Sequence, residues 1–247
     1  MNIMVFDKKE IFKFIMISVI VLSACIGSKD YVRDVFSELS TQNEKAPENF
    51  FESNGNNEIA LTFEIDASSA GLDILLAILK DRNVPATFFV LGSWANNNPD
   101  EVKKILEEGH GLGNHTMTHQ NALDLSTGNF SDEVKACHEI VKSITGKEMK
   151  LFKFTYNSYD NTTINNLRQL EYIPVGASII TDDISDISKE EILSNIKNSN
   201  NLKSGAIIEF NLASKNCLNS INEVINFLES EKYTFVKLDD TKFNLEK

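Results

Sequence analysis

Histidines give the clearest sign of chemistry in this chain of 247 residues. Three of its four histidines, His110, His115 and His119, fall within one stretch of ten residues. His115 and His119 are four residues apart, so one helical turn or a tight loop would direct both imidazoles to one point, as a transition metal requires. Two surface histidines can have the same spacing, so the pair alone does not establish a metal site. We expect His110, which precedes a strand-like segment, to be a buried structural residue.

The elements that would position these histidines begin near Glu58. From there, apolar runs of strand length alternate with helical patterns at least six times. Strands are predicted at residues 59–63, 86–91, 151–155, 173–178, 206–210 and 233–236, and helices at residues 72–79, 102–106, 131–145, 162–170, 189–196 and 221–228. This α/β order predicts a parallel sheet with helical crossovers, either doubly wound or closed into a barrel, with active groups on loops at the carboxyl ends of strands.

Three segments together resemble the NodB-type polysaccharide deacetylases, carbohydrate esterase family 4. These segments read LTFEID from Leu61, VPATFFVLG from Val84 and GHGLGNHTMTH from Gly109, and the resemblance runs in order from about Glu58 to Val236. It implies a distorted (β/α) barrel with fewer than eight repeats. It also implies hydrolysis of N-acetyl groups on cell-wall or chitin-like glycans. In that chemistry a divalent metal, expected to be zinc, on an Asp-His-His set polarises the acetyl carbonyl and activates water, while a carboxylate base and a histidine acid move the protons.

The first motif of that family, Thr-Phe-Asp-Asp-Gly, is altered in this chain to Thr-Phe-Glu-Ile-Asp. Glu64 keeps a carboxylate at the position of the base, but Ile65 stands at the position of the metal ligand and cannot ligate. Asp66 would replace that ligand if the strand had ended and the loop bulged; on a regular strand, Glu64 and Asp66 would share a face. The candidate metal ligands are therefore Asp66, His115 and His119, with Glu64 as the candidate base.

The third motif, Arg-Pro-Pro-Tyr-Gly in the family, appears here as Lys-Phe-Thr-Tyr-Asn from Lys153. Lys153 can neutralise Glu64 but cannot make the two-pronged contact of a guanidinium group, so the base would be less well oriented. Tyr156 is retained and is the candidate substrate-binding residue. Asn157 replaces a glycine, and asparagine tolerates a left-handed backbone better than most residues do.

The fourth and fifth motifs have lost side chains that the family uses. Asp183 keeps the acid of the fourth motif, but Ile184 replaces its tryptophan. Asn211 replaces the histidine acid of the fifth motif, and an amide has no proton to give near neutral pH, although it can hydrogen-bond an acetyl group or an amine. Loss of acid assistance costs about 10²- to 10⁴-fold in rate. The expected deacetylase activity is therefore weak.

Two other functions fit the same sequence. A pseudoenzyme that uses this groove to bind glycan or a cell-envelope partner would account for Ile65, Ile184 and Asn211. A purely structural lipoprotein would leave the block from His115 to His119 unexplained. The charge of −12, from 24 basic and 36 acidic residues, argues against nucleic acid as a partner. The three cysteines are too few and too scattered for a disulfide scaffold or a thiolate zinc cage.

The first 24 residues are typical of a processing segment. A short basic stretch precedes nine apolar or small residues at 14–22, which suits a signal peptide better than a membrane-spanning helix. The following Leu-Ser-Ala-Cys resembles the bacterial lipobox, which predicts lipid on Cys25. We therefore expect a signal peptide at 1–24, a lipidated Cys25 and polar tether at 25–57, and a deacetylase-like domain at 58–247. An uncleaved anchor helix is the alternative; the lipoprotein would be exported and held by its lipid anchor at the membrane of the cell envelope.

Overall fold

The computed structural model describes residues 47–53, 57–66, 68, 70–181 and 187–243. The expected signal peptide, Cys25 and most of the expected tether lie outside the described residues, as do Asp183 and Ile184. In the part of the chain that is described, no helix combines the length and the apolar character needed to cross a membrane.

One parallel sheet organises residues 46–247. Its strand order is β5-β4-β3-β2-β1-β7-β6, and β8 pairs with β1 off this path. Every strand pairing among the described residues is parallel. The strands are β1 (Glu58–Ile65), β2 (Thr87–Val90), β3 (Gly111–Asn114), β4 (Leu151–Lys153), β5 (Ile173–Val175), β6 (Ile179–Ile180), β7 (Ile207–Asn211) and β8 (Thr234–Phe235). The expected parallel α/β architecture, a distorted barrel, is thereby confirmed.

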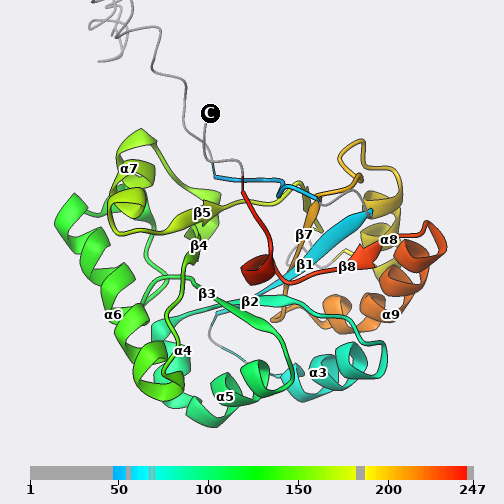
Figure 1. Ribbon diagram of the computed structural model, residues 1–247, viewed down its shortest axis with the longest axis horizontal. Coiled ribbons are helices and arrows are strands. Elements are labelled where there is room, and N and C mark those ends of the chain that lie inside the picture. Colours follow the sequence, from blue (N-terminus) through cyan, green and yellow to red (C-terminus); the bar gives the residue numbers. More distant parts are fainter. Residues whose placement is uncertain (1–46, 54–56, 67, 69, 182–186, 244–247) are drawn as a thin grey trace, which may run out of the picture. The chain divides into compact units, whose positions relative to one another are not determined.

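Helices lie around the outside of the curved sheet (Figure 1). They are α3 (Leu72–Asp81), α4 (Gly92–Asn97), α5 (Pro99–Glu107), α6 (Thr127–Thr145), α7 (Asn161–Gln169), α8 (Lys189–Lys197) and α9 (Lys215–Ser230), with short 3₁₀ turns η1 (Ala122–Asp124), η2 (Thr155–Asn157) and η4 (Leu238–Asp240). Local side chains fix several helix starts: Ser126 caps α6, and capping boxes open α7 at Asp160 and α8 at Ser188. Helix α6 begins four residues before the predicted start because of that serine cap.

The core lies between the sheet and its helices. The Phe63 ring of β1 stacks against Phe88 of β2 and Phe210 of β7, with ring centroids 5.3 and 5.4 Å apart. Cys137 and Cys217 are both fully buried in the same core. His110 is buried as predicted, and its Nδ1 accepts a hydrogen bond from the Ala86 amide at 3.2 Å.

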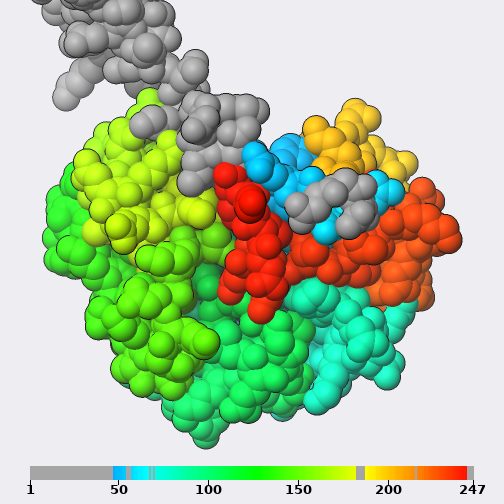
Figure 2. Space-filling model, viewed as in Figure 1, coloured from blue at the N-terminus to red at the C-terminus, as the bar shows by residue number. Residues whose placement is uncertain are grey.

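The amino ends of the strands are covered by the C-terminal segment, which crosses this face in red in Figure 2. The Leu238 amide donates to Thr87 Oγ1 at 2.9 Å, and Leu238 packs in a small cluster with Ala60, Phe89 and Ile207. Functional side chains are therefore to be sought at the opposite, carboxyl ends of the strands.

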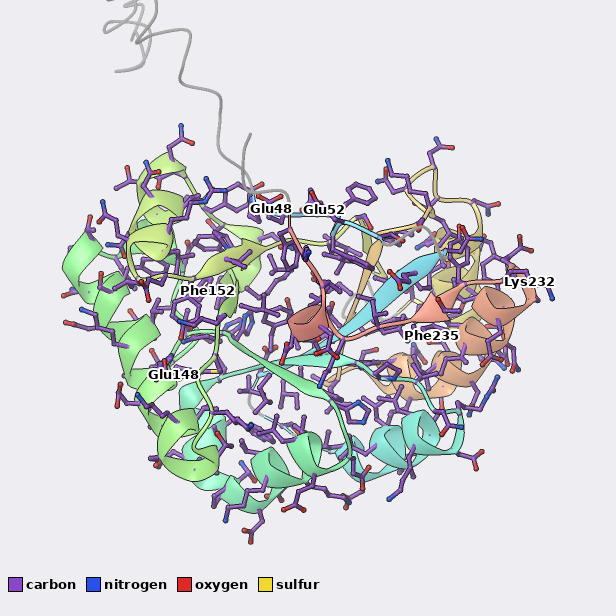
Figure 3. The ribbon with its side chains drawn as sticks, viewed as in Figure 1. Glu48, Glu52, Glu148, Phe152, Lys232 and Phe235 are labelled. Carbon is purple, nitrogen blue, oxygen red and sulfur yellow. The ribbon has the colours of Figure 1, made fainter. Side chains whose placement is uncertain are left out.

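Residues 47–53 pair with the domain, although the composition assigns them to the tether. Glu48 bridges to Val175, and Glu52 bridges to Lys242; Figure 3 labels both glutamates on this segment. Phe51 is buried. The compact unit accordingly begins near Ala46 rather than Glu58, because these bridges and the buried Phe51 hold the segment against the domain.

Candidate active site

The candidate residues converge because they follow parallel strands that end at one edge of the sheet. Asp66 follows β1, His115 follows β3, and Lys153 and Asn211 are the last residues of β4 and β7. The pairing register sets Glu64 of β1 directly beside Asn211 of β7. Parallel strands bring their carboxyl ends together in this way, which is where barrel enzymes place their functional groups.

Asp66, His115 and His119 form a cluster with the geometry of a metal site. Asp66 Oδ1 lies 3.6 Å from His115 Nε2 and 3.5 Å from His119 Nε2. The three candidate ligand atoms all lie within 4.8 Å of one another. Asp66 Oδ1 and His115 Nε2 are buried and have no hydrogen-bond partner among the described residues. Two imidazole nitrogens and a carboxylate oxygen are a typical donor set for a catalytic zinc, so these residues fit a divalent metal.

The tautomer of His115 also suits metal binding. Its Nδ1 lies 3.0 Å from the backbone carbonyl of Lys153, so Nδ1–H donates to that oxygen and the lone pair of Nε2 faces Asp66. Burial lowers the pKa of His115 to about 4, although the nearby Asp66 carboxylate acts in the opposite direction. The imidazole is therefore neutral near pH 7, which is the form that can ligate.

A tight loop, rather than a helical turn, brings the two histidines together. Thr116 and His119 both have positive φ, 72° and 64°, and the His119 amide donates to Thr116 Oγ1 at 3.1 Å. Glu133 of α6 accepts hydrogen bonds from the Met117 and Thr118 amides at 3.0 and 2.7 Å. These bonds satisfy the backbone of a strained loop and hold it against α6.

Asp66 reaches the histidines because β1 ends one residue before it. Ile65 is fully buried in the core, which explains why this position contributes nothing to the cluster. Asn211 Nδ2 donates to Asp66 Oδ2 at 3.0 Å, while Asn211 Oδ1 accepts from the Ala213 amide at 2.8 Å. The amide of Asn211 thus orients Asp66 and closes the turn after β7.

Lys153 lies at the floor of the site and contacts two carboxylates. Its ammonium forms an ion pair with Glu209 and lies 3.9 Å from Glu64 Oε1. The expected contact with Glu64 is therefore present but longer than the contact with Glu209. Glu209 is a residue that sequence reasoning missed. Its signal was a glutamate within the apolar run at 206–210, because a buried charge requires a partner.

Tyr156 lies at the rim, next to His119. The two rings make an edge-to-face contact with centroids 4.8 Å apart, and Tyr156 is 68% exposed. Tyr156 and Asn157 both adopt positive φ, 56° and 48°, so the left-handed backbone expected at Asn157 is present. An exposed aromatic ring beside the cluster is well placed to contact a sugar.

Comparisons with known proteins agree with this geometry. The family model for polysaccharide deacetylase matches residues 52–175. The chain is 30% identical to an uncharacterised 30.6 kDa protein of Geobacillus stearothermophilus, covering 74% of this chain and 70% of the relative. It is also 30% identical to the peptidoglycan-N-acetylglucosamine deacetylase of Bacillus cereus, covering 56% of this chain and half of that protein. The peptidoglycan-N-acetylmuramic acid deacetylase PdaA of Bacillus subtilis is 27% identical, with 76% and 72% covered.

Solved structures show the same fold. A peptidoglycan N-acetylglucosamine deacetylase superposes with a TM-score of 0.74 at 25% identity, covering 81% of this chain and 94% of that one. A CE4 family pseudoenzyme from Bacillus anthracis gives a TM-score of 0.73 at 20% identity, covering 79% and 69%. Residues 52–175, half of the chain, match the family model and contain all three residues of the metal-site cluster. The chain belongs to the polysaccharide deacetylase family, NodB-type carbohydrate esterases of family 4.

Proposed function

We propose that this protein is an exported, metal-dependent deacetylase that removes N-acetyl groups slowly from cell-wall glycans. The observation that carries the proposal is the cluster of Asp66, His115 and His119, with two buried ligand atoms that have no hydrogen-bond partner among the described residues. Two relatives by sequence are peptidoglycan deacetylases by name, one for N-acetylglucosamine and one for N-acetylmuramic acid. Their names support a peptidoglycan substrate and a location at the cell envelope.

Each residue of the site has a defined task in this proposal. Asp66, His115 and His119 would hold the divalent metal, for which zinc is the best match to the donors. When bound there, the metal supplies Lewis-acid polarisation of the acetyl carbonyl and lowers the pKa of water. Glu64 takes the proton of the attacking water. Lys153 places its positive charge 3.9 Å from Glu64 Oε1, and its backbone carbonyl holds His115 in the ligating tautomer.

The proton for the leaving amine has no histidine source among the described residues. Asn211 stands where the family has that acid, and its amide is engaged with Asp66 and Ala213. His110 accepts from the Ala86 amide, and His138 is bonded to the Tyr172 hydroxyl, so neither imidazole serves the site. The leaving amine then takes its proton from the protonated Glu64 carboxyl or from water, with no dedicated histidine acid, which accounts for the expected loss of about 10²- to 10⁴-fold in rate.

The same observation supports a second function, glycan binding without hydrolysis. A fixed asparagine in place of the acid, together with the fold shared with a CE4 family pseudoenzyme, suits a site that holds an N-acetylated sugar but does not cleave it. Tyr156 at the rim would contact the sugar ring in either function. Asp183, which lies outside the described residues, is proposed as an acidic residue that supports the site in the enzyme.

Metal analysis combined with acetate release from N-acetylglucosamine oligomers separates the two functions. Stoichiometric zinc and slow acetate release, both lost in His115→Ala, are the results expected of the enzyme. The matched control is Asp73→Asn, because Asp73 is an exposed helix residue that pairs with Lys104 away from the site; it should retain both. Zinc binding and glycan binding without acetate release would establish the pseudoenzyme instead.

The lipid anchor has a separate test. Cys25→Ser should move the protein from the membrane fraction to the soluble exported fraction, because the proposed thioether to lipid cannot form. A Cys137→Ser variant serves as the control, since Cys137 is buried in the core. Unchanged membrane retention of Cys25→Ser would rule out the lipobox and favour an uncleaved anchor.

A further inference from the structure

A buried lysine between two carboxylates forms the floor of the site. Lys153 is only 2% exposed, and the Glu64 and Glu209 side chains are 12% and 8% exposed. Glu64 and Glu209 lie on the adjacent strands β1 and β7, whereas Lys153 ends β4, which is separated from β1 by β3 and β2 in the sheet. Glu209 and Asn211 are two residues apart on β7, so both point to the same face of the strand. The Glu209 side chain therefore lies on the same face of β7 as the Asn211 side chain.

Glu209 has a stronger hold on Lys153 than Glu64 has. An ammonium is a compact point charge, so its attraction to each of two carboxylates depends on how close it lies to each. Lys153 pairs directly with Glu209 and leaves a 3.9 Å separation to Glu64 Oε1. Without Glu209, the lysine would have Glu64 as its remaining carboxylate partner in this group and would move toward it. Glu209 therefore keeps the ammonium away from the carboxylate that serves as the base.

The net charge of the buried side chains around the site is equal and opposite to that of the divalent metal that the site would hold. Glu64, Asp66 and Glu209 supply three carboxylates and Lys153 supplies one ammonium, a formal charge of −2 in a largely buried site. Resting on the proposed metal site, we propose that Glu209 is a positioning residue that holds Lys153 and, with it, sets the charge of the site to balance a divalent cation. A charge at this depth is weakly screened, so each unit of charge should change metal affinity.

Four proteins test this inference through zinc affinity: wild type, E209Q, K153M and the double variant K153M/E209Q. E209Q removes one negative charge, and zinc should bind about 10- to 100-fold more weakly. The double variant restores the wild-type charge, so its affinity should return to within about threefold of wild type. K153M adds a net negative charge and should bind zinc more tightly than wild type. Competition with a chromophoric chelator measures all four dissociation constants without reference to activity.

Folding is controlled within the same set. K153M leaves two buried carboxylates without their cation and risks unfolding, whereas the double variant replaces a buried ion pair by neutral groups, a change that proteins often tolerate. Thermal midpoints of the zinc-free proteins identify any variant that does not fold. Glu108→Gln is the matched control: Glu108 is a largely buried glutamate that pairs with Lys80 at the amino end of β3, and its loss should leave zinc affinity unchanged.

The outcomes of the two proposals are distinguishable. If wild type binds no zinc, the proposed metal site fails, and this inference fails with it. If wild type binds zinc but E209Q binds it equally well, or K153M/E209Q binds it more weakly than E209Q, only the role of Glu209 is overturned. If the ion pair were purely structural, K153M/E209Q would bind zinc more weakly than E209Q, because the double variant would carry the damage of both substitutions.

Discussion

The two halves of the candidate site have diverged in different ways. On the side of β1 and β3, the ligand position is occupied by Ile65, yet Asp66 supplies a carboxylate to both histidines from one residue further on. On the side of β7, Asn211 takes the place of the acid and is held by two hydrogen bonds. A ligand can be replaced by any oxygen that arrives at the right point. A proton donor can be replaced only by a group of suitable pKa, and an amide is not one.

The largest expected effect comes from returning an acid to the β7 side. Asn211→His should raise the rate of acetate release by about 10²-fold or more, because it restores acid assistance to the leaving amine. Steady-state kinetics on N-acetylglucosamine oligomers measure the change.

Asn211→Ser is the control for that substitution, because serine also removes the hydrogen bond to Asp66 but adds no acid. An equal rate of acetate release in both variants would show that the missing acid does not limit the activity of this protein.

The next effect tests the β1 side. Asp66→Asn keeps the shape of the ligand but removes its charge, and zinc should bind about 10- to 100-fold more weakly. Isothermal titration calorimetry measures the affinity. The control Asp73→Asn removes an equal charge from the surface of α3 and should leave the zinc affinity unchanged. An Asp66→Asn protein with wild-type affinity would mean that a different third ligand completes the site.

Acid should weaken the zinc-free fold through two buried histidines. Burial lowers the pKa of both His110 and His115 to about 4, below the ordinary value of 6.5. The unfolded chain then binds more protons between pH 6.5 and 4, so stability is fully present above pH 6.5 and is lost as the pH falls toward 4, by up to about 3 kcal/mol for each histidine. Denaturant unfolding at a series of pH values measures this loss.

His110→Asn separates the contribution of the structural histidine from that of the site. It should reduce the slope of stability against pH below 6.5, and zinc should protect the remaining part by holding His115 in its neutral form. An unchanged slope in His110→Asn would mean that His110 is not a source of the acid sensitivity.

The smallest expected effect is at the rim. Tyr156→Ala removes an exposed ring that touches His119 but supplies no ligand. We expect KM for N-acetylglucosamine oligomers to rise about three- to tenfold, since stacking on a sugar is worth about 1 kcal/mol, with zinc affinity unchanged. A fall in zinc affinity would instead assign Tyr156 to the support of His119.

Much of the fold was predictable because long elements carry strong periodic signals. The strands at β1, β2, β4 and β7 were expected at nearly their observed positions. Helix α4 was not predicted, because its six residues are too short to show a helical period. The pairing of residues 47–53 with the sheet was also not predicted, since isolated bridges leave only weak patterns in the sequence.

The sequence motifs predicted which residues belong to the site better than they predicted which of those residues contact one another. The histidine pair was evident from its spacing, and the structure places both rings beside Asp66. Whether Asp66 would face the two histidines depended on the residue at which β1 ends. The sequence does not fix that end to within one residue, and a shift of one residue turns a side chain to the other face of a strand. The ion pair between Lys153 and Glu209 joins residues 56 positions apart in the chain, so only the fold brings it into view.

The buried cysteines have a practical consequence for chemical labelling. Cys137 and Cys217 have no exposed surface, and burial raises the pKa of Cys137 to about 12, which leaves almost no reactive thiolate at neutral pH. Within residues 47–243, a single cysteine introduced at the exposed Leu123 would therefore be the preferred target of a maleimide dye. Such a dye can be attached without removal of Cys137 or Cys217.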